Sequence, residues 1–268
     1  MLVSLNVWAG LECRFGEVRA ALADFGFTAR ALVLSVILVP LLALLFSRLI
    51  GLGVGFEIGI MLMAVSGGVP FLPLATSNAG GDIRASVSLV FLLSLVSIFT
   101  APLTLNLLGG AIDIHGLPIG SFIAKLAVFQ LVPLLAGTLT ASTVRPELGN
   151  ALKRVFKTIT AVTILVVLVL LGPKVWQALS VVFATKTVLV IALVIATSMA
   201  IAWITGVRDH SKRVVLTDAT GLRNPGIALL LANTSFPGAV TESAIVAYLV
   251  LQIFAGVISG MLMKRARA

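Results

Sequence analysis

Two short stretches decide the fold of this chain: GGVPFLP at residues 67–73 and TGLRNPG at residues 220–226. Each interrupts a long apolar segment that otherwise suits a helix crossing a bilayer. A proline within a helix removes one backbone donor and clashes with the preceding turn, and in lipid the freed carbonyl groups need partners within the protein. We therefore expect two discontinuous helices, buried among other spans. The helix-breaking residues are Gly67, Gly68, Pro70, Pro73, Gly221, Pro225 and Gly226.

Blocks almost free of charge recur along the rest of the chain. Of its 268 residues, 59% are hydrophobic and 11% are charged, whereas a soluble domain carries roughly 25% charged residues. About 20 apolar residues cross a bilayer once, so these blocks predict an all-α polytopic membrane protein and exclude a soluble fold. The expected spans are 29–50, 56–80, 85–108, 119–142, 157–173, 184–206, 213–235 and 243–263.

Lysine and arginine are distributed unevenly between the two sets of loops. Fourteen lie on one side and four on the other, and Arg223 falls inside a span. Because cytoplasmic loops are enriched in these residues, we expect the richer side, with the C-terminus, to be cytoplasmic. The net charge of +9 then reflects membrane topology and predicts no nucleic-acid partner.

The two halves of the chain have the same order of spans. An uninterrupted span precedes each broken one and another follows it, at 85–108 and at 243–263. The two broken spans run in opposite directions, so we expect an inverted repeat. Interrupted spans at matching places in two halves point to a transporter site near the bilayer midplane. The alternative is a pair of simple kinks, since proline and glycine are common in membrane helices.

Polar side chains gather beside both breaks. Ionisable groups within a membrane are costly, and they are functional candidates for that reason. We predict a substrate-binding or ion-binding site there. The residues are Thr76, Ser77, Asn78 and Asp82 after the first break, and Asp218, Thr220, Arg223 and Asn224 around the second.

Each of these residues also has a structural interpretation. Arg223 is either an anion ligand or a counter-ion to Asp218 or Asp82. Asn224 either contacts substrate or satisfies carbonyl groups freed by the break. Asp82 is either a proton carrier or an interfacial cap, and Asp218 either relays a proton or is paired. The group at 76–78 either contacts substrate or caps the helix that follows the break.

Other functional classes find less support. With a single cysteine, Cys13, and with His115 and His210 in different loops, we expect no disulfide within the chain, no metal site and no cofactor. An intramembrane aspartyl protease would need a Gly-x-Gly-Asp motif, but residues 79–82 read AGGD, and the only tyrosine is Tyr248. A channel or membrane sensor module remains a second alternative.

Several stretches resemble the bile acid:sodium symporter superfamily. They are GIMLMAVSGG at 59–68, GGDIRASVSL at 80–89, LTDATGLRNPGIALLLA at 216–232 and, more weakly, WAGLECRFGEVRAAL at 8–22. The likeness covers nearly the whole chain, but the family's first helix and part of its second have no counterpart. It implies a core domain built on two crossing broken helices, with a panel domain beside it. The panel would comprise residues 1–28, a partial helix and cytoplasmic loop, and 117–176, and the core would comprise 29–116 and 177–268.

The chain departs from the sodium-coupled members of that family at the first break. Their sodium-binding Ser-Asn pair falls on Phe71 and Leu72, or in the other register on Leu72 and Pro73. Of two hydroxyl positions on the next helix, Ser86 is retained and Val90 is not. Ser86 therefore joins the candidate site residues, but most of the expected oxygen ligands are missing.

The second break departs further, because the family's glutamate and glutamine fall on Ala219 and Arg223. Hard cations prefer several oxygen ligands. A guanidinium about 4 Å from a bound cation would repel it by about 4 kcal/mol at an effective dielectric near 20. We therefore expect a secondary transporter of a small organic anion that works by alternating access without sodium, in a prokaryotic inner membrane. The coupling ion and the oligomeric state stay open.

Overall fold

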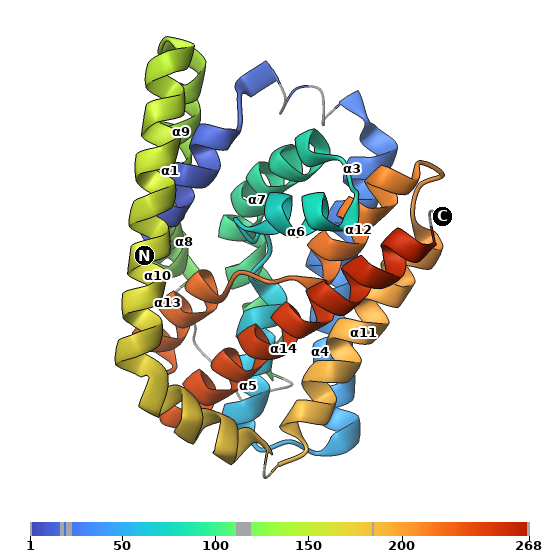
Figure 1. The fold of residues 1–268 in the computed structure, drawn as a ribbon. Helices are drawn as coiled ribbons and strands as arrows, with labels where there is room; N and C mark the ends of the chain where they lie inside the picture. The colour runs from blue at the N-terminus through green and yellow to red at the C-terminus, as the bar shows by residue number, and fades with distance from the viewer. Residues whose placement is uncertain (1, 17–18, 20–22, 111–118, 184, 267–268) are drawn as a thin grey trace.

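The computed structural model describes residues 2–16, 19, 23–110, 119–183 and 185–266, and the regular elements in this part of the chain are all helices, without strands (Figure 1). The elements of the first half are α1 (Leu2–Glu12), α3 (Phe25–Leu32), the π-helix η1 (Val33–Leu38), α4 (Val39–Ile50), α5 (Val54–Val65), α6 (Leu72–Ala79) and α7 (Ile83–Gly109). Those of the second half are α8 (Ile119–Leu126), the π-helix η3 (Ala127–Leu131), α9 (Val132–Thr143), α10 (Pro146–Phe183), α11 (Thr187–Thr205), α12 (His210–Gly221), α13 (Pro225–Ser235) and α14 (Ala239–Arg265).

Among the described residues, five continuous helical stretches are long and apolar enough to cross a bilayer. They are Phe25–Ile50, Ile83–Gly109, Ile119–Thr143, Thr187–Thr205 and Ala239–Arg265. The expected span at 157–173 lies within α10, although most side chains of that stretch are outside the described residues. The prediction of an all-α polytopic membrane protein is confirmed.

Both predicted breaks are present. α5 ends at Val65 and α6 begins at Leu72, while α12 ends at Gly221 and α13 begins at Pro225. Pro73 and Pro225 each occupy one of the first two positions of the helix after the break, where the missing N–H is no loss because the first helical amides have no partner within the helix. The two spans are therefore discontinuous rather than kinked.

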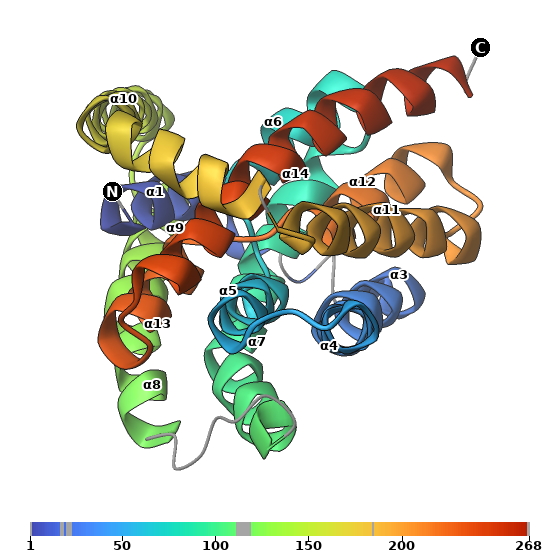
Figure 2. The same ribbon diagram turned by 90° about the horizontal axis from the view of Figure 1, so that it is seen from below.

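The elements around the breaks form one packed body. α5 packs against α4, α7, α13 and α14, and α12 packs against α6, α7, α11 and α14. Figure 2 shows α5 near the middle of the bundle and α4 beside α11 at one flank. Each broken helix thus has neighbours from the other half of the chain.

A second group of helices stands along the opposite flank, where α1 packs against α9 and α10 (Figures 1 and 2). The backbones of α1 and α9 touch: a Cβ on Gly10 would lie 2.1 Å from the carbonyl oxygen of Leu134, and one on Gly137 would lie 2.3 Å from that of Val7. Only glycine permits such an approach, so this pair of helices is closely fitted.

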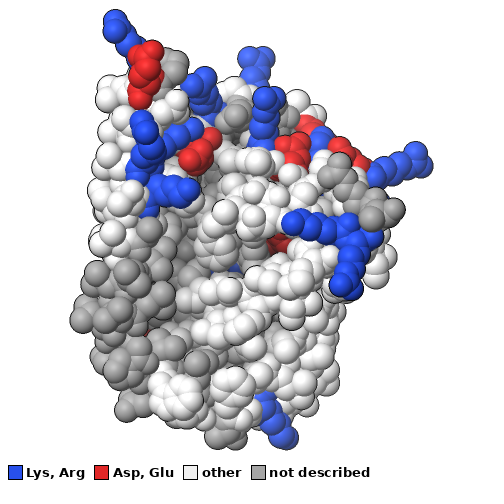
Figure 3. All heavy atoms as spheres, viewed as in Figure 1, with Lys and Arg blue, Asp and Glu red and all other residues white. Residues whose placement is uncertain are grey.

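Charged side chains collect at one end of the visible face, where α7, α10 and α12 begin (Figures 1 and 3). Ion pairs there join Lys153 to Glu12 at 3.2 Å and Lys212 to Asp24. A further pair joins Arg48 at the end of α4 to Glu57 at the start of α5. The uneven charge of the sequence therefore corresponds to one charged end of the fold.

Candidate functional site

The two breaks touch each other. The backbone N–H of Asn224 donates to the carbonyl oxygen of Ser66 at 2.8 Å, and the side-chain Nδ2 of Asn224 donates to that of Gly68 at 3.3 Å. The Oδ1 atom of the same side chain accepts from the amides of Gly226 and Ile227, at 3.1 and 3.4 Å. Asn224 therefore caps α13 and ties the second break to the first.

Gln252 on α14 closes the backbone of the second break. Its Oε1 accepts from the N–H of Arg223 at 2.8 Å, and its Nε2 donates to the carbonyl oxygen of Arg223 at 3.1 Å. Gln252 was not predicted from the sequence. Its signal is an amide within an apolar span, since such side chains commonly bond across membrane helices.

The guanidinium of Arg223 is fully buried and bonds to backbone carbonyl groups. Its Nη1 donates to Ser35 at 3.0 Å and its Nη2 to Thr220 at 2.8 Å, while its Nε has no partner. None of the ion pairs among the described residues includes it. The interpretation of Arg223 as a counter-ion to Asp218 or Asp82 is therefore wrong.

The helix geometry explains why these two carbonyl groups are free. Val39 donates to Leu34 in the π-helical pattern, and in that pattern the donor for Ser35 would be residue 40, which is proline and has no N–H. At the end of α12 the carbonyl oxygen of Thr220 would accept from the N–H of Asn224 if the helix continued. That N–H donates to the carbonyl oxygen of Ser66 instead. Arg223 satisfies both carbonyl groups left open.

Asp218 is buried on α12, with 1% of its surface exposed, and neither carboxylate oxygen has a hydrogen-bond partner. Thr76 on α6 is buried as well, and its Oγ1 is also without a partner. Asp82 instead caps α7, where its Oδ1 accepts from the amides of Arg84 and Ala85 at 2.9 and 3.1 Å. The two aspartates therefore do not form the proton-sharing pair that an aspartyl protease needs.

The remaining predicted residues have local surroundings. Thr76, Ser77 and Asn78 lie in the second half of α6, so they do not cap its start, because the helix already begins at Leu72. Ser86 is buried, and its hydroxyl donates to the carbonyl oxygen of Ile83 at 2.7 Å within the same helix.

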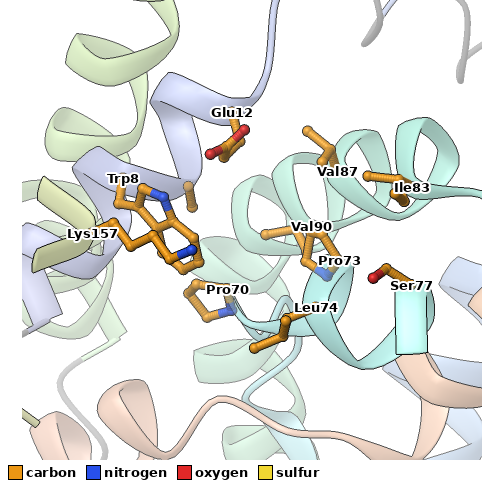
Figure 4. Close-up of a pocket in the computed structure, with 11 residues that line it drawn as sticks. Trp8, Glu12, Pro70, Pro73, Leu74, Ser77, Ile83, Val87, Val90 and Lys157 are labelled. Carbon is orange, nitrogen blue, oxygen red and sulfur yellow. The ribbon is translucent and has the colours of Figure 1, made fainter. Parts of the chain in front are cut away.

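A cavity of about 230 Å³ lies beside the first break, between α1 and α10 on one side and α6 and α7 on the other (Figure 4). Its lining is largely apolar. The residues that line it are Trp8, Ala9, Glu12, Pro70, Pro73, Leu74, Ser77, Ile83, Val87, Val90 and Lys157. Among the residues predicted to bind substrate or ion, Ser77 is in this lining, together with Pro70 and Pro73 of the predicted break, whereas Arg223 and Asp218 are not.

Three polar groups of the cavity were not predicted from the sequence. Lys157 extends from α10 toward Trp8 on α1, and Glu12 lies further along α1 (Figure 4). Glu12 is paired with Lys153 at 3.2 Å, and the indole Nε1 of Trp8 is buried without a partner. Trp8 and Glu12 lie near the start of the chain and Lys157 lies beyond its middle, so only the fold brings them together.

Comparison with known proteins agrees with this architecture. A search of curated proteins finds no match. The profile of the Sodium Bile acid symporter family matches residues 1–175, which is more than half of the chain and runs from α1 through the first break into α10. On that match, the chain belongs to the sodium bile acid symporter family of membrane transporters.

Proposed function

We propose that this protein moves a small organic anion across the membrane by alternating access, and that the anion binds in the cavity between α1, α6, α7 and α10. The observation that carries the proposal is Lys157 in the lining of a largely apolar cavity. The charge of Glu12 is balanced by Lys153, so Lys157 leaves the cavity with a positive charge. An anion with an apolar body suits such a lining.

The unpartnered indole N–H of Trp8 supports the same class of ligand. A buried donor without a partner costs about 1–3 kcal/mol, and a carboxylate oxygen from the ligand would satisfy it. The volume of about 230 Å³ is below the roughly 300–1,000 Å³ typical of pockets for drug-sized ligands. We therefore favour a small anion.

The helices that face each other across the cavity suggest which parts of the protein move. We propose that 1–28 and 117–176 form the panel, and that 29–116 and 177–268 form the core with the crossed breaks. Sliding of the core along the panel would open the cavity to either side. The charge bias of the loops favours a cytoplasmic C-terminus, in a prokaryotic plasma membrane.

We further propose that transport does not use sodium. The positions expected to bind it carry Leu72 and Ala219, which are buried and apolar, and Arg223, whose guanidinium occupies the crossing. In this arrangement Arg223 holds η1 against the end of α12 through the carbonyl groups of Ser35 and Thr220, and its charge adds positive potential. The other candidate polar residues near the breaks would shape the site rather than contact the anion.

Counterflow in proteoliposomes tests the proposed function. A thermal-shift screen of small carboxylates and sulfonates against the purified chain selects the probe, which is then radiolabelled and exchanged against unlabelled anion. Hydrogen bonds to charged groups contribute about 1.5–3 kcal/mol, so Lys157→Met should weaken apparent affinity about tenfold or more. Arg154→Met removes the same charge from α10 outside the lining and should have little effect. Absence of counterflow for every anion of the screen would refute the proposal.

A further inference from the structure

We propose that Asp218 is a proton-binding site, and that its proton is the coupling ion that drives anion uptake. The proposal deepens the proposed function and rests on it. Asp218 lies one turn before the second break, where its backbone carbonyl accepts from the N–H of Leu222 at 2.8 Å. Its side chain is buried and both carboxylate oxygens lack a hydrogen-bond partner.

The surroundings of Asp218 offer it no counter-charge. α12 packs against α3, η1, α6, α7, α11 and α14, and η1, α6 and α11 contain no titratable side chain. None of the titratable groups on the other elements, on α12 itself or in the break hydrogen-bonds to its carboxylate. Those groups are Arg30 on α3, Arg84 on α7, Glu242, Tyr248, Lys264 and Arg265 on α14, His210, Lys212 and Arg213 on α12, and Arg223 in the break.

A bare carboxylate is not stable in such a place. An ionised side chain in the middle of a membrane costs at least about 2.5 kcal/mol on insertion scales, and here no donor offsets that cost. In this conformation Asp218 therefore holds a proton. It can ionise only in a conformation that admits water to α12.

The contact between α12 and α6 connects the entry of water to Asp218 with the opening of the cavity. A Cβ on Gly81 would lie 2.3 Å from Cγ2 of Thr76 and 2.9 Å from Cγ1 of Val214, so these two side chains meet there. Asp218 follows Val214 by four residues and shares its face of the helix. α6 also supplies Pro73 and Ser77 to the cavity, so one movement of α6 can expose both the anion and the carboxyl group.

The proton step at Asp218 balances in atoms and in charge. On one side of the membrane the carboxylate of Asp218 takes a proton from water and becomes a neutral acid, which closes into the buried state seen here. On the other side the acid returns the proton to water. One proton moving with one monoanion transfers no net charge.

Infrared spectroscopy without any transported anion tests the proton site. In lipid nanodiscs at neutral pH, the wild-type chain should show a carboxylic-acid carbonyl band that disappears in Asp218→Asn. Asp82→Asn, which keeps a capping side chain on α7, should retain the band. Equal bands in the wild type and Asp218→Asn would overturn the proposal.

If Asp218→Asn does not fold, carbodiimide modification of the wild type replaces it. A protonated carboxyl group gives its proton to the carbodiimide and adds through its oxygen to the central carbon, so mass spectrometry should locate the adduct on Asp218 at neutral pH, with less at alkaline pH. Adducts on other carboxyl groups but none on Asp218 would overturn the proposal.

Transport in sodium-free choline buffer tests the coupling. With the carboxylate that gives the largest counterflow, an inside-alkaline gradient of one pH unit should support up to about tenfold accumulation, the ratio that corresponds to about 1.4 kcal/mol. Asp218→Asn should lose accumulation but keep counterflow. Accumulation that does not depend on the pH gradient, or that persists in Asp218→Asn, would refute proton coupling. Absence of counterflow in the wild type would refute the proposed function instead, and the infrared test of the proton site would remain valid.

Discussion

Gly68 in the first break lies directly against Ser94 on α7. The hydroxyl of Ser94 donates to the carbonyl oxygen of Gly68 at 3.2 Å, and a Cβ on Gly68 would lie 2.5 Å from that hydroxyl oxygen. Gly68 also has a φ of +75°. Because Asn224 donates to the same carbonyl oxygen, this one residue connects α7 with both breaks.

Gly68→Ala should therefore destabilise the protein strongly. The left-handed backbone alone costs a non-glycine residue about 1–2 kcal/mol, and overpacking against Ser94 adds about 1–3 kcal/mol. The control is Gly51→Ala, because Gly51 has a φ of +72° but a Cβ added to it would meet no atom within 4 Å. Thermal unfolding in detergent should show the larger loss for Gly68→Ala. Equal losses would mean that contact with Ser94 contributes nothing.

Asn224→Ala should cost about 1–2 kcal/mol of stability. Loss of a helix N-cap costs about 0.5–2 kcal/mol, and the bond to Gly68 is lost with it. Asn233→Ala on the same helix is the control, since Asn233 is exposed and bonds only to Leu229 one turn earlier. A melting temperature for Asn224→Ala equal to that of Asn233→Ala would argue against the crossing as a stabilising contact.

The breaks could be predicted from the sequence because proline and glycine act locally. Pro225 disfavours an uninterrupted helix wherever it falls, and together with the neighbouring glycines it favours a break over a kink. The prediction of a break therefore depended on few residues, and the structure confirms it, with α12 ending at Gly221 and α13 beginning at Pro225.

The partners of Arg223 could not be predicted in the same way. They depend on the π-helical turn before Pro40, which frees the carbonyl group of Ser35, and on the contact between the breaks, which frees that of Thr220. The cavity was missed for a similar reason, since Trp8 and Lys157 meet only after α1 and α10 have packed.

Asp24 should make stability depend on pH in the acid range. Its hydrogen bond from Lys212, with help from the amide of Phe27, lowers the pKa of this carboxyl group below its ordinary value of 3.8. The stabilisation is therefore present above pH 3.8 and is lost as pH falls through the lowered pKa. At pH 7, Asp24→Asn should melt below the wild type, and the difference should vanish toward pH 2. Lys212→Met should reproduce the loss at pH 7, and the double variant should lose no more than either single one.

Anion counterflow should be unaffected when sodium is replaced by choline. Leu72 and Ala219, at positions where sodium ligands were expected, have no side-chain oxygen that could bind the ion. The measurement compares initial rates in the two salts at constant ionic strength and pH. A rate that collapses in choline would show that a cation site exists elsewhere among the polar groups of the crossing.

Arg223 should stabilise the contact between η1 and the second break rather than act as half of an ion pair. Arg223→Lys keeps the charge but replaces a planar fork with a single ammonium group, which cannot reproduce the two bonds that lead to Ser35 and Thr220. Each bond from a charged donor contributes about 1.5–3 kcal/mol, so a loss near 3 kcal/mol is expected in thermal unfolding, against little change for the exposed control Arg208→Lys. Adding Asp218→Asn should not restore Arg223→Lys or Arg223→Ala, because Asp218 is not its partner. Rescue by that second change would reveal an ion pair, and an Arg223→Lys chain that remains folded but loses anion binding would instead make Arg223 a direct ligand.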